Sequence, residues 1–173
     1  ETARRDYCLY TTNTLTNLLQ LIIVESKSRD EIIEYAHKQI TNLLQARVPL
    51  EQLVITRSLN RTNYANKQPH SELAKRMAKR NPGFKVQAGE RISYLFIHQP
   101  GSKLISEQSE EPLYVIEHNL PIDYEYYANH QLEKPLIRIL ANVLTPNGDQ
   151  KETKKILYGG KMLTVKRIKP PPS

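Results

Sequence analysis

The sequence has few of the residues that build disulfides and metal cages. It contains no tryptophan and a single cysteine, Cys8, among 173 residues. One cysteine can neither close an internal disulfide nor supply a cysteine-rich zinc cage. We interpret Cys8 as a small buried apolar residue, and we expect the chain to come from a reducing intracellular compartment.

Long hydrophobic runs are also missing. The longest run covers residues 18–24, is interrupted by Gln20, and is much shorter than the roughly 20 residues that cross a bilayer. No secretory signal opens the chain, which begins at Glu1 without an initiator methionine. We therefore expect no membrane partner, and a sequence that is a piece of a longer protein, a processed chain or an expressed fragment.

Motifs for catalysis are absent as well. No two aspartates form the short acidic motif that would hold two metal ions for nucleotidyl transfer. The five histidines lack zinc-ligand spacing, and the segment 159–161 lacks the glycine spacing of a phosphate-binding loop. We expect no catalytic residue, no metal site and no cofactor within this chain.

Charge, in contrast, is abundant and unevenly placed. Residues 57–91 carry nine basic and two acidic residues, for a net charge of +7, and residues 151–173 carry a net charge of +6. Residues 92–150 carry three basic and eight acidic residues, and we interpret their acidic run at Glu107, Glu110 and Glu111 as solvated surface. This asymmetry indicates a polyanionic partner held by particular surfaces. A charged face without any partner is the alternative that composition leaves open.

Hydrophobic periodicity predicts a helical hairpin in the first part of the chain. Apolar residues at three- and four-residue steps predict helices over residues 6–24, capped by Asp6, and from Ser28 toward Pro49. The pair Ser28 and Glu31 has the spacing of a capping box.

The remaining elements are mixed. We expect strands at residues 53–56, 92–98 and 113–117, a helix over 69–80, and a helical region from 123 to 144 that Pro135 breaks or kinks. The tail from Lys151 is expected to be mobile at its end. The fold class is therefore α+β and helix-dominated, with a helical hairpin, a small β-sheet and further helices.

Six phrases occur in this order: ETARRD (1–6), LVITRSL (53–59), YANKQPHSELAKRM (64–77), GERISY (89–94), EPLYVIEHNLPIDY (111–124) and YYANHQLEKPL (126–136). Together they resemble the thumb region of family-B DNA polymerases of the delta type, cellular or from a large DNA virus. Position 57 is arginine where the family often has lysine, and the match fades after residue 145.

This resemblance implies a domain organisation. Residues 1–145 would form the thumb, with 1–10 as the junction to the palm. Residues 146–173 would form a basic C-terminal extension that leads toward a further module. The palm with its catalytic aspartates and Mg²⁺, the fingers and the exonuclease would lie outside this chain, which by itself would have no polymerase activity.

The resemblance and the basic block together imply a duplex-binding role. A thumb must hold every primer-template sequence, so phosphate contacts should dominate over base contacts. The residues that we predict to contact DNA are Arg4, Arg5, Arg57, Arg61, Tyr64, Asn66, Lys67, His70, Arg76, Arg80, Arg91 and Tyr94. Structural alternatives stay open: Arg4 and Arg5 pairing with nearby acids, Arg91 pairing with Glu117 or Asp123, and a structural His70.

Partners follow from the same resemblance. We expect primer-template duplex, the remainder of the polymerase, and a sliding clamp or accessory subunits, in the nucleus if the protein is cellular and at a replication site if it is viral. The alternative is a stand-alone nucleic-acid-binding adaptor or one chain of a split polymerase.

Overall fold

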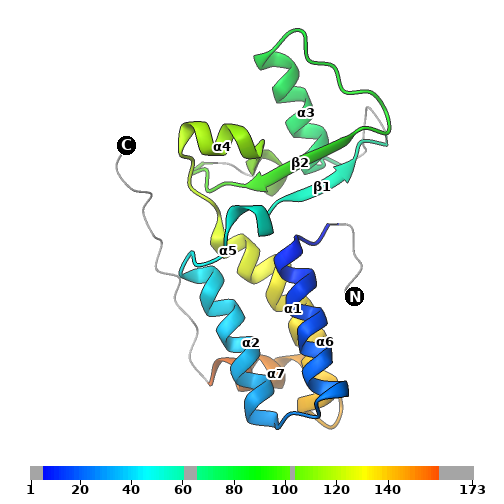
Figure 1. The fold of residues 1–173 in the computed structure, drawn as a ribbon, viewed down its shortest axis with the longest axis vertical. Helices are drawn as coiled ribbons and strands as arrows, with labels where there is room; N and C mark the ends of the chain where they lie inside the picture. The colour runs from blue at the N-terminus through cyan, green and yellow to red at the C-terminus, as the bar shows by residue number, and fades with distance from the viewer. Residues whose placement is uncertain (1–5, 61–65, 102–103, 160–173) are drawn as a thin grey trace. The chain divides into compact units, whose positions relative to one another are not determined.

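The computed structural model describes residues 6–60, 66–101 and 104–159. Helices dominate, and three short strands form an antiparallel sheet, which confirms the α+β prediction (Figure 1). The chain divides into two compact units. The helical unit contains the described residues 6–52 and 124–159, and the mixed unit contains the described residues of 53–123.

The helical unit begins with the predicted hairpin. Helix α1 (Leu9–Leu19) continues into a π-helix, η1 (Gln20–Val24), and a short turn leads to α2 (Arg29–Leu44) (Figure 1). Leu15 and Leu18 of α1 are fully buried, as expected from their spacing. The predicted start is wrong: the N-cap is Cys8 rather than Asp6, and it makes no side-chain cap. The burial predicted for Cys8 is confirmed.

The capping box predicted at the start of α2 is confirmed. The Ser28 hydroxyl accepts a hydrogen bond from the Glu31 amide at 3.3 Å, and the Glu31 carboxylate accepts one from the Ser28 amide at 3.1 Å. At its other end α2 finishes well before Pro49, because Ala46 adopts the left-handed conformation at φ 56°. A 3-10 turn, η2 (Leu50–Gln52), completes this half of the unit.

The second half of the helical unit continues past the proline that was expected to break it. Helix α5 (Tyr124–Tyr126) is followed by a π-helix, η4 (Tyr127–Glu133), and by α6 (Lys134–Leu144), which has Pro135 in its first turn. Proline cannot donate the amide that an α-helix requires. The chain meets this constraint by widening to the i+5 pattern just before Pro135, and the backbone at Glu133 and Lys134 stays helical.

Beyond residue 146 the structure contains a helix that the sequence reading missed. Helix α7 (Gln150–Tyr158) is capped by Asp149, whose carboxylate accepts hydrogen bonds from the amides of Lys151 and Glu152. Tyr158 donates a hydrogen bond to the half-buried Glu133, and Lys154 pairs with the same carboxylate at 3.1 Å. At least up to Tyr158, the segment expected to be a basic extension is therefore part of the helical unit.

The mixed unit contains a sheet with the strand order β1-β2-β3. Its elements are β1 (Ile55–Ser58), α3 (Pro69–Arg80), β2 (Arg91–Phe96), the 3-10 turn η3 (Ile105–Gln108), β3 (Ser109–Glu110) and α4 (Pro112–His118). The bounds predicted for α3 are confirmed. The first predicted strand lies two residues further along the chain.

The strand predicted over residues 113–117 is wrong, because this segment is the helix α4. Its β-branched residues favour a strand locally. However, Pro112 occupies the first turn, and Asn119 closes the helix in the left-handed conformation at φ 49°. Val115 is buried, whereas Leu113 and Ile116 are 58% and 63% exposed.

The capping box gives a direct test of the hairpin. Replacing Ser28 by alanine removes the side-chain acceptor of the Glu31 amide. We expect the free energy of unfolding to fall by about 1 kcal/mol in urea denaturation. Lys27→Ala changes a neighbouring exposed side chain and should stay within about 0.5 kcal/mol of the wild type. Equal effects of the two substitutions would contradict the role of the cap.

Candidate nucleic-acid interface

Helix α3 covers one face of the sheet in the mixed unit. Ile55 pairs with Tyr94 and Arg57 with Ile92, so these four side chains share that face. Ile55, Ile92 and Tyr94 are buried. Arg57 donates a hydrogen bond of 3.3 Å to Gln68, the residue that precedes α3, and so connects this face to the start of the helix.

The opposite face of the β1–β2 ribbon carries small hydroxyl groups and one arginine. Thr56 pairs with Ser93, their hydroxyl oxygens lie 2.8 Å apart, and Ser58 pairs with Arg91. Arg91 and Ser93 are exposed, and Thr56 and Ser58 are partly exposed. We call these four residues the open face. Hydroxyl and guanidinium donors are groups that commonly bind phosphate oxygens.

On α3, the two arginines that were predicted to contact DNA are engaged within the unit. Arg76 donates hydrogen bonds to the backbone oxygen of Ser109 and, at 3.0 Å, to its hydroxyl oxygen. Arg80 binds both carboxylate oxygens of Glu110 at 2.7 Å, and its guanidinium lies 3.9 Å from the centre of the Tyr114 ring. These contacts attach α3 to β3 and α4. Contact of Arg76 and Arg80 with DNA stays a prediction; the contacts that the structure shows for both lie within the unit.

Glu110 corrects the interpretation of the acidic run as solvated surface. This residue is only 4% exposed, although Glu107 and Glu111 are partly exposed. Burial alone would raise the pKa of Glu110. The hydrogen bonds from Arg80 and from the Glu111 amide, and the charges of Arg80 and Arg76, outweigh this effect and hold the pKa below its usual value. The carboxylate is therefore ionised at neutral pH, paired with Arg80.

The outward side of α3 carries lysines instead. Lys75 and Lys79 are exposed and four residues apart, so they share a side of the helix. Lys75 forms an exposed ion pair of 3.4 Å with Glu72, a contact that contributes little to stability. Lys79, Lys85 and Arg91 are exposed and form no ion pair with another described residue, so the alternative pairing of Arg91 with Glu117 or Asp123 is not present.

Two predicted DNA contacts are corrected by burial. Tyr94 is 1% exposed, and its ring packs edge-on against Phe96 at 5.4 Å. His70 is completely buried, which, together with the nearby charge of Arg57, lowers its pKa to about 4. A buried side chain cannot reach a phosphate, and this imidazole is neutral at physiological pH. This burial favours the alternative in which His70 is a structural histidine.

Of the other predicted DNA contacts, two are described by the structure and four lie outside the described residues. Asn66 is exposed, and Lys67 is exposed but pairs with Glu107 at 3.2 Å. Arg4, Arg5, Arg61 and Tyr64 lie outside the described residues. The sequence reading missed the open-face residues Thr56, Ser58 and Ser93. Alternation along the two strands was the signal that could have found them, because it separates one apolar side from one polar side.

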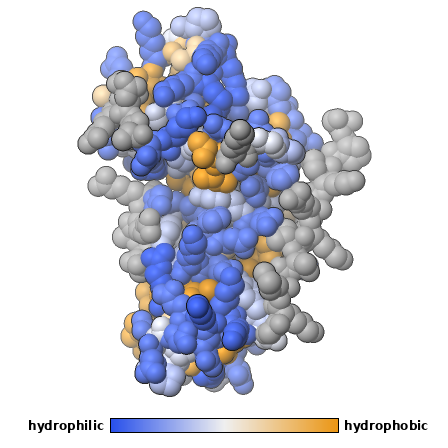
Figure 2. All heavy atoms as spheres, turned by 180° about the vertical axis from the view of Figure 1, so that it is seen from behind, coloured by the Kyte–Doolittle hydropathy of each residue, from blue (hydrophilic) through white to orange (hydrophobic). Residues whose placement is uncertain are grey.

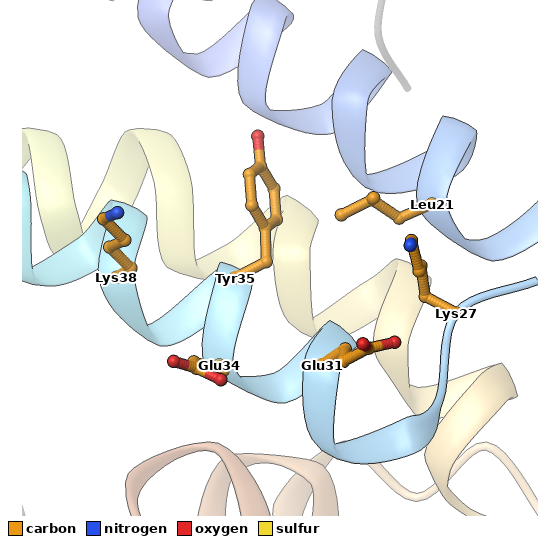
Figure 3. Close-up of a pocket in the computed structure, with 6 residues that line it drawn as sticks. All are labelled: Leu21, Lys27, Glu31, Glu34, Tyr35 and Lys38. Carbon is orange, nitrogen blue, oxygen red and sulfur yellow. The ribbon is translucent and has the colours of Figure 1, made fainter. Parts of the chain in front are cut away.

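The helical unit offers a weaker alternative site, a shallow groove beside α2 (Figure 3). Leu21 and Tyr35 form its apolar part, and two lysines and two glutamates line the rest: Lys27, Lys38, Glu31 and Glu34. Because the charges of these four residues cancel, the groove has no preference for an anion.

The described part of the chain has neither a metal-binding cluster nor a membrane-spanning helix. Residues 6–60, 66–101 and 104–159 contain no group of three or more histidine, cysteine, aspartate or glutamate side chains that could hold a metal ion. None of the helices in these ranges combines the length and the apolar character needed to span a bilayer. The side seen in Figure 2 is mainly hydrophilic, with scattered hydrophobic areas.

Comparison with known proteins gives a consistent result. The family model described as DNA polymerase family B matches residues 1–143. The DNA polymerase delta catalytic subunit of Candida albicans is 42% identical over 170 residues, covering 98% of this chain and 16% of that protein. The same subunit of Mesocricetus auratus is 39% identical over 180 residues, covering 96% of this chain and 16% of that protein.

A solved structure supports the same relation. The family B DNA polymerase of the archaeon Pyrobaculum calidifontis matches 81% of this chain with a TM-score of 0.68 and 27% sequence identity, over 18% of its own length. The chain thus spans about one sixth of the length of the polymerases that it matches.

The pair of Arg80 and Glu110 predicts an unequal effect of two neighbouring substitutions. Arg80→Ala leaves a buried carboxylate without its main partner, which costs about 3–5 kcal/mol in a fully buried pair. Because the Arg80 side chain is 35% exposed, we expect a loss of about 2–3 kcal/mol in urea unfolding. Lys79→Ala, one residue earlier on the outward side, should change stability by less than about 0.5 kcal/mol. Similar losses in both variants would contradict the proposed clamp.

His70 predicts a specific pH dependence. Between its usual pKa of 6.5 and about 4, the unfolded chain binds a proton on this imidazole that the folded chain does not. The free energy of unfolding should therefore fall as the pH is lowered from 6.5 toward 4, with a slope contribution of up to about 1.4 kcal/mol per pH unit. His70→Asn should reduce this slope, measured by urea unfolding at several pH values, whatever its effect at pH 8. An unchanged slope in the variant would contradict the assignment.

Proposed function

Because this chain belongs to DNA polymerase family B, we propose that it is the thumb of a delta-type polymerase and grips primer-template duplex by the phosphate backbone. The observation that carries the proposal is the open face of the β1–β2 ribbon. Thr56, Ser58, Ser93 and Arg91 present only short hydroxyl donors and one guanidinium, on a sheet whose other face is covered by α3.

The chemistry of the open face suits binding without sequence selection. Small hydroxyl groups and arginine donate to phosphate and sugar oxygens, which are the same at every base pair. The open face contains no large apolar side chain that could wedge between bases. The role of a thumb requires this independence from sequence, because a replicative polymerase must hold every duplex that it makes.

The position of α3 separates two cationic surfaces of the mixed unit. Arg91 lies on the open face, whereas Lys75 and Lys79 lie on the outward side of α3, across the layer that α3 and the sheet form. One straight duplex cannot lie flat against both sides of this layer. We assign direct contact to the open face. Asn66 and Lys67 stay predicted contacts, as do Arg61 and Tyr64, which lie outside the described residues. Arg57 also stays a predicted contact, although its side chain lies on the face that α3 covers. The lysines on the far side of α3 add long-range attraction to DNA.

Catalysis is assigned outside this chain. Two-metal nucleotidyl transfer needs carboxylates clustered on a rigid scaffold, and the described residues do not fit this requirement. We therefore place Mg²⁺ and the catalytic aspartates in another part of the polymerase. Arg4 and Arg5, beside the proposed palm junction, would reach the primer end. The remainder of the polymerase and a sliding clamp or accessory subunits are proposed partners.

Salt dependence and substitution test the proposed grip. We expect the affinity of the chain for a 20-base-pair duplex, measured by fluorescence anisotropy, to fall roughly 40-fold between 50 and 200 mM salt, as expected for about three neutralised phosphates. Arg91→Ala should weaken binding several-fold for every duplex sequence and reduce the salt slope by about 1.

Two control substitutions make this test specific. Lys79→Ala, on the other side of α3, should weaken binding less than Arg91→Ala. Lys38→Ala changes an exposed lysine of the helical unit and should leave affinity unchanged. Affinity that stays flat with salt would contradict the phosphate grip. A loss in Arg91→Ala confined to some duplex sequences would indicate base readout instead.

A further inference from the structure

A buried glutamine joins the first described residues of the chain to a π-helix far along the sequence. The side-chain amide of Gln131 donates a hydrogen bond of 2.7 Å to the backbone oxygen of Asp6. Its side-chain oxygen accepts one of 3.1 Å from the backbone amide of Cys8. One side chain thus holds the backbone on both sides of Tyr7, as a neighbouring strand would do.

Helix α1 has no side-chain cap of its own, and this contact satisfies the amide of its N-cap residue. Its N-cap, Cys8, makes no capping hydrogen bond with its side chain, although the first amides of a helix need partners. The amide of Cys8 finds its acceptor 123 residues away in sequence. Gln131 is 4% exposed, so the hydrogen bonds that it makes are shielded from water.

The π-helix explains why a glutamine can reach this position. Gln131 lies in η4, between Tyr127, Ala128 and Leu132, which are all at most 1% exposed. Pro135 imposes the change of helical register just after this segment. Single π-turns recur at functional sites because they re-aim side chains without ending the helix.

We propose that Gln131 is a positioning residue that sets the direction in which the chain enters the helical unit. In the polymerase, an inference that rests on the proposed function, this direction fixes how the thumb is held relative to the chain before residue 6. Losing the contact would let the thumb release the duplex more often. It would leave the chemistry of nucleotide addition unchanged, because no residue of the reaction centre is altered.

The first test measures amide hydrogen exchange in the full 173-residue chain. Gln131→Met has nearly the same side-chain length and neither hydrogen-bonding group. We expect the protection of the Cys8 amide to fall roughly tenfold or more, as the loss of its acceptor implies, while the amides of Leu15 and Leu18 keep theirs. Gln39→Met is the matched control, because Gln39 of α2 accepts a hydrogen bond from the Tyr10 side chain of α1, whereas the acceptor of the Cys8 amide is Gln131. Unchanged protection at Cys8 in Gln131→Met would overturn the inference.

A second variant covers the case in which Gln131→Met does not fold. Gln131→Glu keeps an oxygen facing the Cys8 amide, and when protonated it regains the donor for the Asp6 oxygen. With the introduced carboxyl group ionised, repulsion between it and the Asp6 oxygen should separate residue 131 from the start of α1. The protection of Cys8, corrected for the intrinsic pH dependence of exchange, should therefore be low and should recover on protonation. Protection that does not vary with pH would overturn the inference.

The functional half is measured separately in a polymerase that carries this segment. Gln131→Met should reduce the number of nucleotides added per binding event several-fold, with the nucleotide KM and the single-nucleotide incorporation rate unchanged. A loss of incorporation rate instead would contradict a positioning role. Failure of the chain to bind duplex would remove the proposed grip, but it would leave the exchange result at Cys8 as an independent test of the entry contact.

Discussion

The elements of the mixed unit are connected by a buried carboxylate that pairs with a partly exposed arginine. Glu110, on the short edge strand β3, is almost completely buried and is held by two hydrogen bonds from Arg80 at the end of α3. The Arg80 guanidinium also lies against the ring of Tyr114 in α4. One side chain therefore connects a helix, a strand and a second helix. Removing Arg80 would leave the buried Glu110 charge poorly solvated, whereas removing Glu110 would leave a guanidinium that already reaches solvent.

This constraint decides which cations of the basic block are available to a partner. Arg76 and Arg80 face the sheet edge and make intramolecular hydrogen bonds, whereas Lys75 and Lys79, on the other side of the same helix, remain exposed. Because α3 covers one side of the β1–β2 ribbon, the proposed duplex-binding surface is the other side. The structural contacts and the proposed binding surface thus both follow from the packing of α3 against one face of the sheet.

In the helical unit, the side-chain amide of Gln131 makes the corresponding long-range contact. A proline inside a long helix and an uncapped helix start are both unfavourable alone. In this chain the π-helix before Pro135 accommodates the proline and also carries Gln131, which satisfies the amide of Cys8 at the start of α1. One segment of the chain thus meets a local constraint and makes a contact 123 residues away in sequence.

Local signals in the sequence determined much of the architecture: the capping box of Ser28, the bounds of α3 after Pro69, the α+β class, the basic block and the family resemblance. Each depends on neighbouring residues or on composition, which a sequence displays directly. Predictions from local sequence preference were wrong where a residue's packing partner lies far away in the sequence. The segment 113–117 is a helix despite its β-branched residues, and Glu110 is buried within an acidic run. Only the tertiary structure could divide the arginines of α3 from its lysines, bury His70 and Tyr94, and bring Gln131 to Cys8, because burial and long-range hydrogen bonds depend on which surfaces meet in the folded chain.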